Sequence, residues 1–177
     1  MTDRKAAFEI SEVSARELDG LVPPLGRLLQ ACVEDGAGIG FVLPLNLETA
    51  SRFWSGQKAA VEAGGAHLIV ARDGGDVIGT VMLLLAQQNN GGHRAEVAKL
   101  MVHPQARRRG VARRLLAAVE QKAQALGRTL LVLDTVTGDA AEGMYARLGY
   151  HHVGVIPGYA VAARGGLQAT TVFYKQL

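Results

Sequence analysis

The chain has 177 residues and a mass of 18.7 kDa, with 49% hydrophobic and 20% charged residues, close to the average for globular proteins. This composition excludes a disordered chain, a collagen-like repeat and a coiled-coil rod, and the length predicts a single domain over residues 1–177. The net charge of +3 favours an anionic ligand without identifying one.

The first third of the chain alternates one strand with two helices. Apolar spacing predicts a strand at residues 8–13 and an amphipathic helix over residues 16–34. We expect Pro23 and Pro24 to mark where this helix begins, since proline is favoured in a first turn. A second helix is predicted over residues 47–63, with Asn46 as its N-cap and two glycines, at 64 and 65, as its end.

The middle of the chain changes from an antiparallel to a parallel pattern. Strands at residues 67–72 and 77–87 flank an Asp-Gly-Gly-Asp turn, which is typical of a β-hairpin, and a third strand follows at residues 95–103. A helix over residues 109–126 then leads to an apolar strand at residues 129–133. A strand, a helix and a second buried strand predict a right-handed crossover with parallel strands.

The last third of the chain predicts a short helix and two more strands. The helix covers residues 140–148, and the strands cover residues 151–159 and 167–175. The fold class is therefore mixed α/β, with a mostly antiparallel central sheet, one parallel pair and flanking helices. Ligands are expected at the C-terminal ends of the parallel strands.

A cluster of arginines lies at the start of the helix over residues 109–126. Arg107, Arg108 and Arg109 precede Gly110, and Arg113 and Arg114 follow within about one turn. The first N–H groups of a helix lack intrahelical partners and favour anions, and the small residues Gly110 and Ala112 let a ligand approach closely. The pattern predicts a pyrophosphate site. A nucleic-acid patch is the alternative, but no aromatic residue lies among these arginines to stack on bases.

The spacing of Arg107, Gly110 and Ala112 resembles the coenzyme A loop of the GCN5-related N-acetyltransferases, whose pattern is (Arg/Gln)xxGx(Gly/Ala). The resemblance covers the chain from about residue 8 to residue 175. It implies the fold of that family, in which the parallel strands splay apart, and acetyl-CoA as co-substrate. It also implies a set of cofactor-binding residues: Leu100, Met101, Val102, Arg107, Arg108, Arg109, Gly110, Val111, Ala112 and Arg113.

Three side chains are candidates for the chemistry of acetyl transfer to an amine. Tyr145 matches the helix-borne tyrosine of the family in the pattern YxxxG(Tyr/Phe), and a phenol can protonate a leaving thiolate. Asp134, after four apolar residues, is either a helix-entry cap or a ligand for the substrate ammonium, and we favour the ligand. Glu96 is either a strand-edge charge or a base, and it lies about 16 Å of extended strand before Met101, so it would act through water.

A closer resemblance concerns the acceptor. The segments 94–102, 133–135 and 157–160, together with the end of the chain at 173–175, are similar to the tabtoxin-resistance acetyltransferase group. This implies a small primary amine, amino-acid-like or antibiotic-like, as the acceptor. A protein N-terminus or lysine, or a non-catalytic acyl-CoA sensor, is the alternative. Gly138 stands where many family members have Asn, and Phe41, Trp54 and Tyr159 could line the acceptor pocket.

The remaining expectations concern compartment and partners. The longest uncharged, strongly apolar run, residues 77–86, is far shorter than the roughly 20 residues of a membrane span, and residues 1–10 carry four charges and no signal-like segment. Cys32 is the only cysteine, which fits a reducing cytosol. The neighbouring histidines His151 and His152 would point to opposite faces of a strand, so no metal is expected. Homodimers are frequent in the family, which makes a homodimer one expectation.

Overall fold

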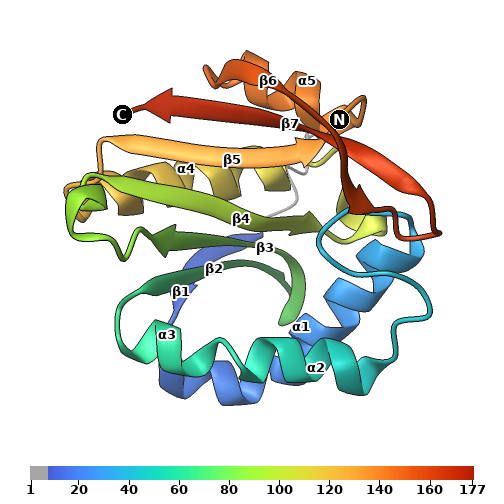
Figure 1. Ribbon diagram of the computed structural model, residues 1–177. Helices are drawn as coiled ribbons and strands as arrows, with labels where there is room; N and C mark the ends of the chain where they lie inside the picture. The colour runs from blue at the N-terminus through green and yellow to red at the C-terminus, as the bar shows by residue number, and fades with distance from the viewer. Residues whose placement is uncertain (1–7) are drawn as a thin grey trace, which may run out of the picture.

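The computed structural model describes residues 8–177, and all of its strands belong to one seven-stranded sheet (Figure 1). The expectation of no secretory signal concerns residues 1–10, of which residues 1–7 lie outside the described part. No helix in residues 8–177 is both long and apolar enough to cross a membrane.

The strand order confirms the mixed sheet. The strands follow the order β1-β2-β3-β4-β5-β7-β6, and only β4 and β5 are parallel. Their bounds are β1 Glu9–Val13, β2 Ala66–Asp73, β3 Asp76–Leu85, β4 Arg94–Val102, β5 Leu130–Val136, β6 His151–Val161 and β7 Leu167–Gln176. The predicted hairpin is confirmed, because Gly74 and Gly75 adopt the positive φ angles that its two-residue turn requires.

Helix α1, Ala15–Glu34, begins eight residues before Pro23, the start predicted from its prolines. A capping box sets the true start: Ser14 Oγ accepts from Glu17 N (3.3 Å), and the Glu17 carboxylate accepts from Ser14 N (2.9 Å). Pro23 and Pro24 lie inside the helix, where their missing N–H groups cost hydrogen bonds. The helix continues because leucines on one of its faces are fully buried, which outweighs local propensity.

The predicted second helix is two helices, α2 Leu47–Ser55 and α3 Lys58–Glu62, interrupted at Gly56. Its predicted cap is confirmed, since Asn46 Oδ1 accepts from Thr49 N (2.8 Å). Helix α4, Val111–Ala125, provides the crossover between β4 and β5, and α5, Ala140–Arg147, follows β5. Two short 3₁₀ helices, η1 Asn89–Gly91 and η2 Pro104–Ala106, flank β4.

The sheet divides the core into two layers. Along β2, Ile69 and Ala71 pack with α4 on one face, while Leu68 and Val70 pack with α1 and α2 on the other. This alternation is the two-residue period of a strand buried on both faces. In Figure 1, α1, α2 and α3 lie below the sheet and α4 lies behind it.

The parallel pair is short. Only Arg94, Ala95 and Glu96 of β4 pair with β5, and from Leu133 onward β5 pairs with β7 alone. Lys99 lies in a bulge with φ 52°, where the register with β3 slips between Thr80 and Met82. An extra residue in one strand bends that strand. As a result β4 and β5 diverge toward their C-terminal ends (Figure 1), as the family resemblance implies.

Candidate active site

A cavity of about 870 Å³ lies where β4 and β5 diverge. Its walls come from six parts of the fold: the loop after α1, the second half of β4, the N-terminus of α4, the end of β5, the start of α5, and the facing parts of β6 and β7. The cavity therefore lies at the C-terminal ends of the parallel strands, where the sequence predicted a ligand.

The N-terminus of α4 forms one end of this cavity. Gly110, the residue before the helix, is left-handed (φ 81°), and no side chain caps the helix. The first intrahelical bond of α4 runs from Arg114 N to Gly110 O, and the N–H groups of Val111, Ala112 and Arg113 have no acceptor within residues 8–177. Three bare amides at a helix N-terminus attract an anion.

The predicted cofactor-binding residues divide into two groups. Nine of them line the cavity: Leu100, Met101, Val102, Arg107, Arg108, Gly110, Val111, Ala112 and Arg113. Arg109 does not line it, because its guanidinium is paired with Asp73 in the β2–β3 turn (2.6 Å). Arg114 also turns away and lies over the Phe8 ring.

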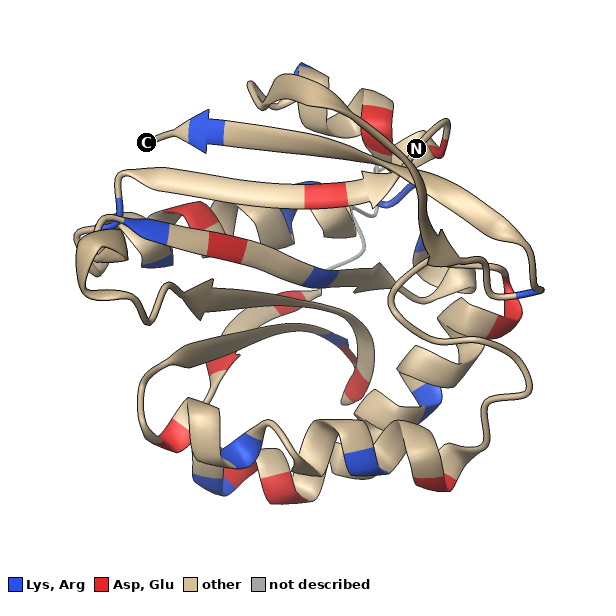
Figure 2. Ribbon diagram, viewed as in Figure 1, with Lys and Arg blue, Asp and Glu red and all other residues tan. Residues whose placement is uncertain are grey.

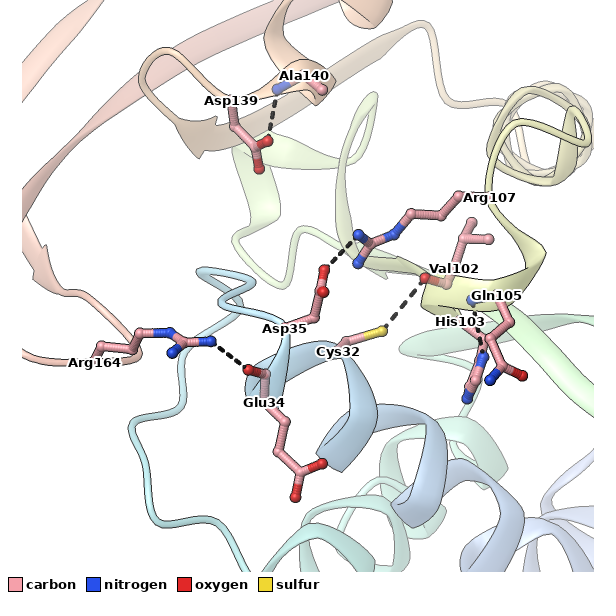
Figure 3. A network of polar contacts seen from close by, with 10 residues as sticks. All are labelled: Cys32, Glu34, Asp35, Val102, His103, Gln105, Arg107, Asp139, Ala140 and Arg164. Atoms are coloured by element: carbon pink, nitrogen blue, oxygen red, sulfur yellow. Dashed lines mark hydrogen bonds and ion pairs between the residues drawn. The ribbon is translucent and has the colours of Figure 1, made fainter.

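Arg107 joins the α4 loop to the end of α1. Its guanidinium pairs with Asp35, directly after α1, and Figure 3 shows this contact beside the hydrogen bond from Cys32 Sγ to Val102 O (3.5 Å). The Cys32 side chain is 1% exposed, and burial raises its pKa to about 11. This thiol is therefore not a ready nucleophile.

The candidate carboxylates lie on the two diverging strands. Glu96 is in the last residue pair that joins β4 to β5, and Asp134 follows two residues later on β5. Figure 2 shows acidic positions on both β4 and β5, and the side chains of Glu96 and Asp134 line the cavity. Burial, and then the charge of Asp134, raise the pKa of Glu96. Thr170 Oγ1 donates to Asp134 Oδ2 (2.7 Å), so β7 orients that carboxylate.

Tyr145 reaches the same cavity from α5. Its side chain is 5% exposed, with its ring 5.5 Å from the ring of Tyr150 and 5.8 Å from that of Phe173. Burial, together with the charges of Asp134 and Asp139, raises the pKa of Tyr145 far above 10. The hydroxyl therefore keeps its proton across the physiological pH range, which is the form that an acid requires.

Of the three aromatic residues expected to line the acceptor pocket, only one lines the cavity. Tyr159 on β6 lines the cavity and is 55% exposed. Trp54 is fully buried, and its indole donates to Leu25 O (2.9 Å), so this aromatic belongs to the core. Phe41 packs edge-on against Phe53 and does not line the cavity.

Sequence reasoning gave Lys99 no role in the site, and the structure adds the loop after α1 to the cavity wall. Lys99 stands in the bulge of β4 and lines the cavity, a position that its place in an apolar stretch of the sequence did not indicate. The loop closes one side of the site. Leu43 N donates to Ala163 O (2.8 Å). Arg164 donates to Glu34 O (2.8 Å), as Figure 3 shows, and the two hydrogen bonds tie this segment to the β6–β7 hairpin.

Gly138, where the family often has Asn, serves a local turn. It has φ 82°, and its N–H donates to the Glu142 carboxylate (2.6 Å), which also accepts from Thr171 (2.9 Å). Glu142 thus holds the start of α5 against β7. Within residues 8–177, no three His, Cys, Asp or Glu side chains form a group that could hold a metal ion.

Comparisons with known proteins identify the family. Residues 42–150 match the model of the Acetyltransferase (GNAT) family. An uncharacterized N-acetyltransferase encoded in the hisH-hisA intergenic region of Azospirillum brasilense is 38% identical over 133 residues, which are 71% of this chain and 76% of that protein. The chain belongs to the GNAT acetyltransferase family.

Solved structures show the same fold as this GNAT protein. A GCN5-related N-acetyltransferase from Kribbella flavida superposes with a TM-score of 0.77 at 23% identity, covering 97% of this chain and 98% of that one. The yncA protein of Salmonella typhimurium, solved with its cofactor acetyl-CoA, gives a TM-score of 0.76 at 18% identity. The match covers 97% of this chain and 94% of that one. The matched family segment includes β4, α4 and Tyr145 but excludes residues 35–41 and both C-terminal strands, which also line the cavity.

Proposed function

We propose that this GNAT protein transfers the acetyl group of acetyl-CoA to a primary amine of a small molecule by direct attack, with an amino-acid-like or antibiotic-like acceptor as in the tabtoxin-resistance group. One observation carries the proposal. The bare amides of α4, the unpaired edge of β4 and the carboxylates of Glu96 and Asp134 all face one cavity.

The α4 end of the cavity suits the diphosphate of coenzyme A. The N–H groups of Val111, Ala112 and Arg113 would bind its oxygens, and Arg108 and Arg113 would add charge. Beyond Glu96, the edge of β4 that faces β5 has no strand partner, so Leu100 and Val102 can offer backbone groups to an extended ligand. When bound there, acetyl-CoA would supply an activated thioester.

The opposite end of the cavity suits the amine. Asp134 would hold the acceptor ammonium, and Glu96, with its raised pKa, would take its proton directly or through water. Tyr145 would return a proton to the sulfur that leaves. Direct attack is supported by Cys32, the only cysteine, because its buried thiol with a pKa of about 11 offers no covalent route.

Two alternative functions make different demands on the site. A protein N-terminus or lysine as acceptor would need room for a peptide, and a sensor of acyl-CoA would need no proton-transfer groups. The presence of Tyr145, Glu96 and Asp134 on the cavity favours an enzyme over a sensor. A cytosolic location, the absence of nucleic-acid or membrane partners and a homodimeric state are further parts of this proposal.

The decisive experiment is an acceptor screen with acetyl-CoA. Purified protein is incubated with amino acids, aminoglycosides, polyamines and short peptides, while free thiol release and the mass of the acetylated product are followed. Acetylation of small amines supports the proposal, and acetylation of peptides alone would favour the protein acceptor. Binding of acetyl-CoA with no turnover by any acceptor would favour the sensor.

A further inference from the structure

Of the cations that line the cavity, Lys99 is the one that neither pairs with a carboxylate of residues 8–177 nor has a part in the proposed reaction. Four cationic side chains line the cavity, namely Lys99, Arg107, Arg108 and Arg113. Three of these belong to the loop and first turn of α4, at the diphosphate end. Lys99 alone stands on β4, on the same wall as Glu96 and near Asp134.

The surroundings of the Lys99 ammonium leave it available to a ligand. Within residues 8–177 it makes no ion pair and no hydrogen bond. Its Nζ lies 5.6 Å from the centre of the Phe53 ring, and a Cβ added to Gly40 would lie 3.4 Å from it. The ammonium is thus held between an aromatic face and a glycine of the loop after α1, without an anionic partner.

The backbone directs this side chain. Lys99 adopts φ 52°, a conformation that residues other than Gly, Asn and Asp rarely take. The bulge that contains Lys99 also bends β4 away from β5 and so opens the cavity. The position of the lysine is therefore coupled to the shape of the site.

We propose that Lys99 binds a carboxylate of the acceptor, so that the substrates are amines that also carry a carboxylate, such as free amino acids. This inference rests on the proposed function, since it names the acceptor class of the same site. The ammonium of a zwitterion would meet Asp134 and Glu96, while its carboxylate would meet the one cation on that wall.

The electrostatics of Lys99 agree with this role. Burial lowers the pKa of Lys99, and the carboxylates of Glu96 and Asp134 act in the opposite direction. A half-buried ammonium that has lost part of its hydration gains from a bound anion. Glu96 and Asp134 influence it from a distance, since neither is within ion-pair range.

The test compares amino acids with the corresponding amino acid amides, which keep the α-amine and lack the carboxylate. In the wild-type protein, kcat/KM for the acids is expected to exceed that for the amides by about 10-fold or more. Lys99→Asn, which suits a left-handed backbone, should remove this preference, mainly through KM, whereas Lys99→Arg should keep part of it. Lys58→Gln, at an exposed lysine paired with Asp19, is the matched control and should behave like the wild type.

Two further measurements separate the possible failures. Acetyl-CoA affinity and thermal melting of Lys99→Asn should match the wild type, which excludes misfolding as the cause of a loss. Calorimetric titration of each acid and amide into the CoA-saturated protein tests recognition even without turnover. Equal binding and equal turnover of acids and amides by the wild type, or equal loss of both in Lys99→Asn, would overturn the assignment of Lys99. Absence of acetylation with preserved acid preference in binding would instead refute the proposed reaction and retain the carboxylate site.

Discussion

Gly38, in the loop after α1, lies against Val136 at the end of β5 so closely that a Cβ at position 38 would overlap the Val136 side chain and the Gln168 amide. Gly38 and Val136 are 98 positions apart in the sequence, yet the loop and the β5–β7 wall together close the cavity. A single hydrogen as side chain permits this approach.

Gly38→Ala should therefore push the loop away from β5 and open the acceptor side of the cavity. We expect a loss of roughly 1–3 kcal/mol in the free energy of unfolding, from overpacking, and a higher KM for the acceptor. Thermal melting and steady-state kinetics check this. Gly20→Ala in α1 is the matched control, because a Cβ there meets nothing within 4 Å and a helical Gly to Ala change stabilises by about 0.5–1 kcal/mol. Equal melting temperatures for the two variants would contradict the close approach.

Gly110→Val should weaken acetyl-CoA binding by crowding the bare amides of α4. The substitution also strains the backbone, since φ is 81° at this position. Gly127, just beyond the other end of α4, has φ 69° and an equally open Cβ position, so Gly127→Val reproduces the strain away from the cavity. Calorimetric titration with acetyl-CoA should show weaker binding for Gly110→Val alone, and matching affinities in both variants would refute the diphosphate site.

Tyr145→Phe removes the proposed acid while keeping the ring packing against Phe173. The expected result is a fall in kcat of about 10²-fold or more, with little change in the acetyl-CoA dissociation constant. Tyr150→Phe, at a neighbouring ring that does not line the cavity, should leave kcat near the wild-type value. If kcat and cofactor binding fell together in Tyr145→Phe, structural damage rather than lost acid catalysis would explain the result.

Glu96→Gln tests whether Glu96 is the base that takes the proton of the amine. Because burial and Asp134 raise the pKa of Glu96, kcat/KM of the wild type should rise with pH through a value above 4.5, and this limb should disappear in the variant. Asp134→Asn removes the repulsion and should move the limb to lower pH. A pH profile that is unchanged in both variants would exclude Glu96 as the base.

The raised pKa of Glu96 also makes the free energy of unfolding depend on pH. A carboxyl whose pKa is higher in the folded state favours folding when protonated, and this contribution is lost as the pH rises through the folded pKa. Glu96→Gln should therefore be more stable than the wild type above that pH and close to it at pH 4. Denaturant unfolding at several pH values measures the difference, and a constant difference across the range would argue against the raised pKa.

Local sequence patterns predicted most of the elements because each carries its own signal. A few neighbouring residues are enough to indicate the local structure at three places: the turn Asp73-Gly74-Gly75-Asp76, the Asn46 cap and the apolar run of β5. The predicted start of α1 was wrong because it was inferred from the prolines rather than from the capping box of Ser14 and Glu17. The long predicted second helix was wrong because the break at Gly56 carried too weak a signal.

The sequence by itself determined the order of the elements and the glycine and arginine signature of α4, because these depend on residues that are neighbours in the chain. Its resemblance to the GNAT family indicated Tyr145 as a candidate acid. Only the tertiary structure decided that Arg109 pairs with Asp73, that Trp54 belongs to the core, and that Lys99 faces the cavity. The physical reason is that side-chain direction in a bulged strand and the choice of ion-pair partner depend on segments far away in sequence, which meet only once the sheet has formed.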